Sequence, residues 1–143
     1  MTANGTVDVN TVGAYTLTYD YTDAAGNEGV QVIRTVNVVD TTNPIITLMG
    51  DATITHEAAT AYTDLGVGWT DTLDGSGTLT ATGTVDVNTV GAYTLTYDFT
   101  DAAGNAGVQV TRTVNVVDTT KPVISLLGDR NVTHSVWTAY SDA

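Results

Sequence analysis

Residues 91–100 read Gly-Ala-Tyr-Thr-Leu-Thr-Tyr-Asp-Phe-Thr, and they decide the fold. Large apolar side chains occupy every second position from Tyr93 to Phe99, and Thr or Asp occupies the positions between them. Because successive side chains of a β-strand point to opposite faces, this alternation predicts a strand with one buried face. The next five residues, Asp-Ala-Ala-Gly-Asn, are turn formers, and valines then alternate with polar residues up to Val116. The two runs predict a long β-hairpin.

Arg112 interrupts the apolar face of the second hairpin strand, and Arg34 does the same in an earlier, nearly identical hairpin. A charged side chain on a core-facing position predicts a β-bulge or a position at the edge of a sheet. The alternative is a salt-bridged arginine on the surface.

Four short β-rich runs precede the hairpin and are divided by turn formers: 45–48, 52–56, 67–70 and 79–87. Threonine and valine are abundant in the chain, whereas Lys, Glu and Leu, the usual helix formers, are scarce. With about seven strands and a turn signal every 8–12 residues or so, the sequence predicts an all-β fold of the immunoglobulin-like sandwich type.

One local pattern sharpens this prediction. Gly91 precedes Tyr93 by two residues, and a core leucine follows the tyrosine by two, a spacing that resembles the tyrosine corner of immunoglobulin-like sandwiches. Gly13 and Tyr15 repeat the pattern near the start of the chain. Trp69 lies where a tryptophan of the third strand could pack into the core.

The chain also repeats itself. Gly5-Thr-Val-Asp-Val-Asn10 returns as Gly83-Thr-Val-Asp-Val-Asn88, a period of 78 residues, and the proline that opens a module stands at Pro44 and at Pro122. A repeat of this length can bury its own core, so we expect modules in tandem, with the two prolines setting the joints. The predicted division is 1–43 for the C-terminal part of one module, 44–121 for a complete module and 122–143 for the N-terminal strands of a third.

Two linked motifs, Asp-Ala-Ala-Gly-Asn and Val-Val-Asp-Thr-Thr-x-Pro, occur in both copies of the repeat. Together with the Gly-x-Tyr-Thr-Leu-Thr-Tyr strand they resemble the tandem immunoglobulin-like repeats of large secreted bacterial adhesins and surface proteins. A related domain is attached to some insecticidal crystal toxins. The resemblance covers the whole chain and implies an extracellular or cell-surface spacer, stalk or interaction module. It carries over no catalytic residues.

The composition excludes several functions. Sixteen acidic residues against four basic ones give a formal charge of −12, which disfavours nucleic acid and anionic membrane as partners. No apolar run is long enough for membrane insertion by this segment. No serine, histidine and aspartate set has a recognisable catalytic spacing, so we expect no enzyme activity. His56 and His134 are expected to be partly buried structural residues.

Calcium is the one ligand that the residues support, because aspartate is frequent and hard cations take six to eight oxygen ligands. Candidate ligands close the last strand of a module, begin the next module or open the hairpin turn: Asp40, Asp118, Asp51, Asp129, Asp23 and Asp101. The segment 71–76 lacks the spacing and terminal glutamate of a twelve-residue calcium loop. Capped turns on an acidic surface are the competing interpretation, and no other cofactor is expected.

Three functions remain open at this point. The first is a structural stalk or fibre segment of a surface protein, whose partners are adjacent repeats. The second is a filament subunit in which segment 122–143 of one copy completes segment 1–43 of the next, head to tail. The third is an adhesin module that binds calcium, a surface glycan or a protein receptor.

Overall fold

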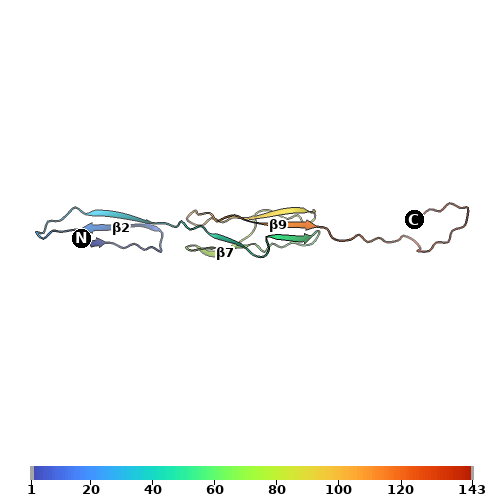
Figure 1. The fold of residues 1–143 in the computed structure, drawn as a ribbon, viewed down its shortest axis with the longest axis horizontal. Coiled ribbons are helices and arrows are strands. Elements are labelled where there is room, and N and C mark those ends of the chain that lie inside the picture. Colours follow the sequence, from blue (N-terminus) through green and yellow to red (C-terminus); the bar gives the residue numbers. More distant parts are fainter. Residues whose placement is uncertain (1, 143) are drawn as a thin grey trace.

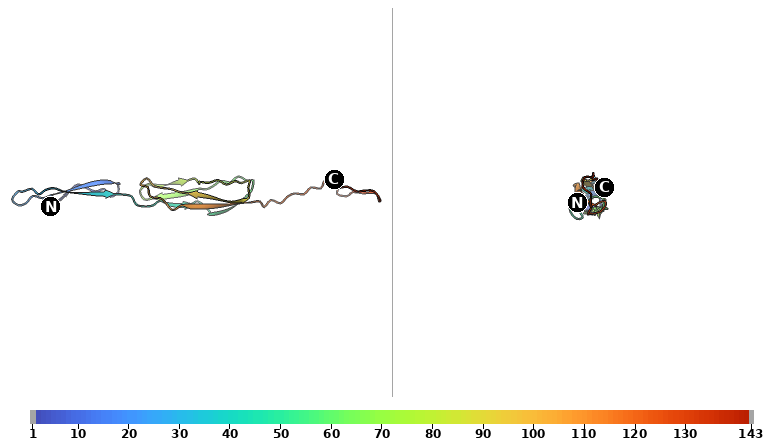
Figure 2. Two further views of the ribbon diagram at one scale, coloured as in Figure 1. Left: turned by 90° about the horizontal axis from the view of Figure 1, so that it is seen from above. Right: turned by 90° about the vertical axis from the view of Figure 1, so that its right-hand side faces the viewer.

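A computed structural model describes residues 2–142 of the chain, and all regular structure in this part is β-strand. The strands are β1 (Thr2–Asn4), β2 (Gly13–Asp20), β3 (Val32–Val38), β4 (Ile45–Leu48), β5 (Thr53–Glu57), β6 (Val67–Asp71), β7 (Gly75–Leu79), β8 (Gly91–Tyr97) and β9 (Val110–Val117). None of the described residues forms a helix long and apolar enough to cross a membrane. The molecule is a thin rod, with a sheet, a sandwich and a strandless tail following one another along a single axis (Figures 1 and 2).

The middle of the rod is a β-sandwich, hereafter the sandwich, formed by residues 45–117. One sheet has the order β4-β6-β7 and is antiparallel, and the other has the order β5-β9-β8, with β5 parallel to β9. The core between the sheets is contributed by both of them: Ile46, Val67, Leu95, Tyr97, Val114 and Val116. This arrangement confirms the predicted all-β fold class, with one complete module in the described chain.

The hairpin that the sequence predicted is formed by β8 and β9. Leu95 and Tyr97 are buried while Thr94 and Asp98 face solvent, as the alternation requires. The strands pair antiparallel over the whole of β8, from Gly91 opposite Val116 to Tyr97 opposite Val110. In the connecting turn Asp101 Oδ1 accepts a hydrogen bond from the backbone N–H of Asn105 at 2.7 Å, which fixes the turn locally.

The tyrosine corner is present in both copies of the repeat. The hydroxyl of Tyr93 donates to the backbone oxygen of Thr89 at 2.8 Å, and the hydroxyl of Tyr15 donates to that of Thr11 at the same distance. A Cβ added at Gly91 or Gly13 would lie 3.7–3.8 Å from the tyrosine ring, an ordinary contact.

Trp69 lies on β6, half-buried, and packs against the core cluster. Its ring is stacked on Phe99 with 3.9 Å between the ring centroids. Gly77 faces it from β7, and a Cβ there would lie 2.8 Å from the indole nitrogen, so this cross-strand position needs glycine. Of the two joint prolines, Pro44 is buried and Pro122 is exposed.

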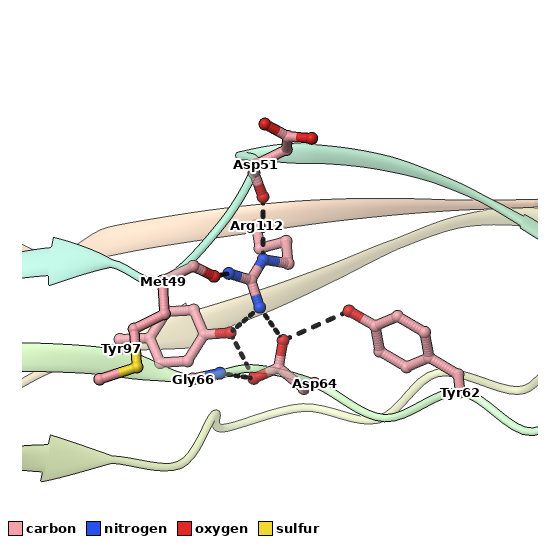
Figure 3. A network of polar contacts seen from close by, with 7 residues as sticks. All are labelled: Met49, Asp51, Tyr62, Asp64, Gly66, Tyr97 and Arg112. Atoms are coloured by element: carbon pink, nitrogen blue, oxygen red, sulfur yellow. Dashed lines mark hydrogen bonds and ion pairs between the residues drawn. The ribbon is translucent and has the colours of Figure 1, made fainter.

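The bulge or edge position predicted for Arg112 was wrong, and the alternative, a salt-bridged surface arginine, was right only about the salt bridge. The side chain of Arg112 is fully buried, and β9, which carries it, is the middle strand of its sheet with an uninterrupted register. The guanidinium group donates to the backbone oxygens of Met49 and Asp51 and forms an ion pair with Asp64 (Figure 3). A buried charge is tolerated here because every side of it has a partner.

Asp64 is the second member of this network and comes from the loop between β5 and β6. It accepts hydrogen bonds from the hydroxyl of Tyr97 at 2.7 Å, from Gly66 N–H at 2.9 Å and from the hydroxyl of Tyr62 at 3.3 Å (Figure 3). Burial raises the pKa of Asp64, but the hydrogen bonds from Tyr97 and Arg112 outweigh it and hold the pKa below its usual value.

The strand expected over 79–87 is also wrong for most of its length. β7 ends at Leu79, and beyond it only Thr82 forms an isolated bridge, to Thr96. The side chain of Asp86 accepts hydrogen bonds from Asn88 N–H at 3.0 Å and from the Thr89 hydroxyl at 2.8 Å. These local bonds form a turn, which replaces the end of the strand.

Residues 2–38 form the head sheet, with the order β1-β2-β3. It repeats the β8–β9 hairpin but has no second layer, and Arg34 is exposed on the edge strand β3. The edge position that the sequence predicted for the two arginines therefore holds for Arg34. The tail, residues 118–142, contains no strand.

Candidate metal centre

Three loops meet at the end of the sandwich that faces the head sheet, and each carries acidic side chains. Asp40 lies in the linker 39–44, Asp71 ends β6, Asp74 lies in the β6–β7 turn and Asp101 opens the β8–β9 turn. Each of these four residues, hereafter the aspartate cluster, offers one carboxylate oxygen, and the four oxygens lie within 4.8 Å of one another.

Local hydrogen bonds explain why the two turns meet. Asp71 Oδ1 accepts from the backbone N–H groups of Leu73 and Asp74, at 2.8 and 3.0 Å, and so shapes the β6–β7 turn. Asp74 Oδ2 accepts from Ala102 N–H at 2.8 Å, which ties this turn to the β8–β9 turn.

The linker is tied to the same place. Asp40 Oδ1 accepts from Thr42 N–H at 2.9 Å, and the backbone oxygen of Asp40 accepts from the side chain of Asn105 at 3.3 Å. Gly107 permits the close approach, because a Cβ there would lie 2.8 Å from the backbone oxygen of Pro44. The position of Asp40 is therefore set by the linker and the hairpin turn together.

Burial and hydrogen bonding oppose each other at Asp101, which is 7% exposed. Burial raises its pKa, but hydrogen bonds from the side chain and backbone of Asn105 outweigh that effect and leave the pKa below its usual value. Asp40 Oδ2 and Asp71 Oδ2 are both buried and accept no hydrogen bond. The cluster thus combines close carboxylates with unused buried acceptors.

All the side-chain ligands that the cluster offers are oxygens, and the chain has no cysteine. Carboxylate oxygens suit hard cations such as Ca²⁺ and Mg²⁺, whereas zinc sites are built mainly from thiolate and imidazole. The residues present therefore fit a hard divalent cation.

Two of the six predicted calcium ligands, Asp40 and Asp101, belong to the cluster, and four lie elsewhere. Asp23 accepts hydrogen bonds in the head hairpin turn, Asp51 precedes β5, Asp118 caps a turn at Thr120 and Asp129 is exposed in the tail. Asp71 and Asp74 were not among the predicted ligands, because their segment lacks the spacing and terminal glutamate of a continuous calcium loop. The available signal was the density of aspartates in a turn next to a module boundary.

The two packed sheets and the tyrosine corner that leads into β8 define the sandwich as an immunoglobulin-like module. Residues 1–38 and 46–116 match the family described as bacterial surface protein, Ig-like domain, and the chain belongs to this family. The match confirms the resemblance and the immunoglobulin-like fold inferred from the sequence. It also places the chain at the cell surface, as predicted.

The chain is similar to parts of longer proteins. Hyalin of Strongylocentrotus purpuratus is 35% identical over an alignment of 123 residues, and the match covers 80% of this chain and 10% of that protein. Hyalin of Lytechinus variegatus is 34% identical over an alignment of 129 residues, and the match covers 85% of this chain and 24% of that protein. A crystallised lipoprotein from Bacteroides thetaiotaomicron is 29% identical with a TM-score of 0.46, covering 55% of this chain and 40% of its own.

Proposed function

We propose that the chain is a stalk segment of a bacterial surface protein, in which immunoglobulin-like modules are joined end to end. The observation that carries this proposal is the path of the chain: the linker reaches the sandwich at one end and the tail leaves β9 at the opposite end (Figure 1). Modules connected in this way add length with each repeat and transmit force along the axis. The proposed role is therefore mechanical and spatial rather than catalytic.

The outgoing chain is held in line by Glu57, the last residue of β5. Its carboxylate accepts hydrogen bonds from Thr119 N–H at 3.0 Å, from the Thr119 hydroxyl at 2.7 Å and from the Thr120 hydroxyl at 2.9 Å. The side-chain hydrogen bond from Thr119, followed by its backbone N–H, lowers the pKa of Glu57. The first residues after β9 thus continue in a fixed direction, which suits an extended array.

Small-angle X-ray scattering of recombinant arrays of one, two and four copies of residues 44–121 tests the stalk. We expect the maximum dimension to grow in proportion to the number of copies. A dimension that grows much more slowly, as for modules folded back on one another, would contradict the proposal.

A filament subunit is the second candidate, and the head sheet favours it. Val32 is 62% exposed where its repeat equivalent Val110 packs against the core, and Arg34 is exposed where its repeat equivalent Arg112 is buried. The head sheet therefore presents to solvent a sequence that the sandwich uses inside its core.

The tail carries the sequence that covers this position in the sandwich. The bend at His134 matches the bend at His56, since in each the Nε2 atom lies 3.1 Å from the backbone oxygen four residues on. His56 is half-buried in the sandwich, whereas His134 is exposed. The hydroxyl of Tyr140 donates to Asp142 at 3.2 Å, and Asp142 stands one period after Asp64.

Asp142 of one copy can then pair with Arg34 of the next, as Asp64 pairs with Arg112 inside the sandwich. The segment equivalent to β5 would add to β3 in the parallel register that β5 and β9 show. Such a head-to-tail contact joins two different surfaces and propagates into a filament.

Light scattering and negative-stain microscopy of the purified chain over a range of concentrations test this second candidate. We expect fibres from the wild-type chain, and none from Arg34→Met or Asp142→Asn. The control is Arg130→Met, whose side chain is exposed and takes no part in the pairing proposed for Arg34. A monomer at every concentration would exclude strand exchange between copies, and it would not affect the stalk proposal.

A further inference from the structure

We propose that the aspartate cluster binds one Ca²⁺ ion, and that this ion fastens the linker to the leading end of the sandwich. The proposal goes beyond the stalk function, because a stalk can be built with or without a cation at its joints. It rests on the spacing of the oxygens, on their missing partners and on the segments that supply them.

The spacing fits a single ion of this size. Calcium binds oxygens at about 2.3–2.6 Å, so two ligands on opposite sides of it lie up to about 5 Å apart. The four cluster oxygens lie within 4.8 Å of one another, which allows all of them to contact one ion. Magnesium binds at about 2.0–2.1 Å and demands near-octahedral geometry, so its opposite ligands must lie closer together.

Missing partners are the second, independent observation. Asp40 Oδ2 and Asp71 Oδ2 are buried and accept no hydrogen bond, and an unpartnered buried carboxylate oxygen is costly. The only ion pair among residues 2–142 joins Arg112 and Asp64, so no lysine or arginine of this part of the chain forms an ion pair with the cluster. A bound divalent cation would supply the missing partner of both oxygens.

The four aspartates come from two parts of the chain, so an ion bound by all of them would join these parts. Asp40 lies before Pro44, whereas the other three aspartates belong to turns of the sandwich. Beside the linker, the head loop around Val9 and Val12 faces Leu73 across a hollow of about 310 Å³, so side-chain packing there is loose. A cation shared by Asp40 and the sandwich turns would therefore be the tightest restraint at this joint.

The repeat provides a matched control. Asp118 stands one period after Asp40 and caps a turn in the same way, with its Oδ1 accepting from Thr120 N–H at 3.0 Å. Among the described residues, Asp118 does not belong to a group of three or more close metal-ligating side chains. Asp118→Asn removes an equivalent carboxylate without touching the cluster.

Isothermal titration calorimetry of the full chain with CaCl₂, at about physiological ionic strength to screen the acidic surface, tests the site. We expect one saturable site in the wild type, and weaker binding of MgCl₂. Asp71→Asn and Asp40→Asn should each lower the calcium affinity at least about tenfold, the scale found even for groups that only support a ligand. Asp118→Asn should leave the affinity unchanged.

The asparagine substitutions should preserve the fold. Asparagine keeps the Oδ1 acceptor that each aspartate uses in its turn. Circular dichroism in EDTA should show unfolding temperatures no lower than that of the wild type, because each substitution removes one of four close carboxylate charges. Asp40→Asn is the second safeguard, because Asp40 lies in the linker outside the strands of the sandwich. No saturable heat in the wild type at millimolar Ca²⁺ would overturn the proposal. Equal weakening by Asp118→Asn would also overturn it, since binding would then belong to the acidic surface as a whole.

Discussion

At the scale of single residues, the chain places the same residue type in two different environments. Arg112 is fully buried among backbone oxygens and Asp64, whereas Arg34, one period earlier, is exposed on an edge strand. The neighbouring sequence is nearly identical in the two copies. The difference in burial therefore comes from the segment that packs over each arginine, and it can be measured inside one molecule.

Arg112→Met should destabilise the sandwich by about 3 kcal/mol, because it leaves Asp64 and two backbone oxygens without their donor. Arg34→Met should change the stability by less than about 0.5 kcal/mol, as for most surface substitutions. Urea unfolding followed by tryptophan fluorescence measures both values. Similar losses in the two variants would show that Arg112 is not a special member of the core.

The same network predicts how stability depends on pH. Burial and the hydrogen bond to Asp64 raise the pKa of Tyr97 to about 12, while an unfolded tyrosine ionises near 10.0. Between these two values the folded state binds more protons than the unfolded state, so the free energy of unfolding must fall as the pH rises. Urea midpoints from about pH 9 to about pH 12 should show this fall.

Tyr97→Phe removes the ionising group and should flatten the alkaline fall. Tyr62, whose pKa burial also raises, would leave a smaller slope. The opposite sign holds for Asp64: its lowered pKa stabilises the folded state above pH 3.8, and this contribution is lost as the pH falls further. An unchanged alkaline slope in Tyr97→Phe would exclude Tyr97 as its source.

At the scale of elements, the tyrosine corner fastens the chain that leads into β8. Tyr93→Phe removes one hydrogen bond, to Thr89, and should cost about 1 kcal/mol in the free energy of unfolding. Thermal or urea unfolding measures it. The control is Tyr140→Phe, whose exposed hydroxyl lies in the strandless tail and should contribute nothing to the sandwich.

The elements also show which features the sequence could reveal. The β8–β9 hairpin and both tyrosine corners were predictable, because alternation, turn residues and the glycine–tyrosine spacing act over a few neighbouring residues. The partner of Arg112 was not, since Asp64 lies 48 residues away and reaches it through a loop. Half of the aspartate cluster could not be predicted for the same reason. Asp71 and Asp74 come close to Asp40 only after two turns and the linker have folded together.

At the scale of the whole molecule, the separate parts are connected by short segments, and their stiffness decides how the rod behaves. The linker 39–44 is held by Asn105 at the backbone of Asp40 and by the approach of Gly107 to Pro44. Next to it the head sheet and the sandwich leave a hollow. A joint with few packed contacts bends easily unless a further restraint is present, and Ca²⁺ at the aspartate cluster would provide one.

A pair of spin labels measures the stiffness of this joint directly. Because the chain has no cysteine, two cysteines can be introduced at chosen sites to carry the labels. Val30→Cys in the head and Thr80→Cys in the sandwich are both exposed and lie outside the cluster. In EDTA we expect a broad distribution of distances between the labels, and in millimolar Ca²⁺ a narrow one. With Asp40→Asn added, the distribution should stay broad in Ca²⁺, since the ion would then be held by the sandwich alone. A narrow distribution in EDTA would instead show that the linker contacts are sufficient, and that the joint is stiff without a cation.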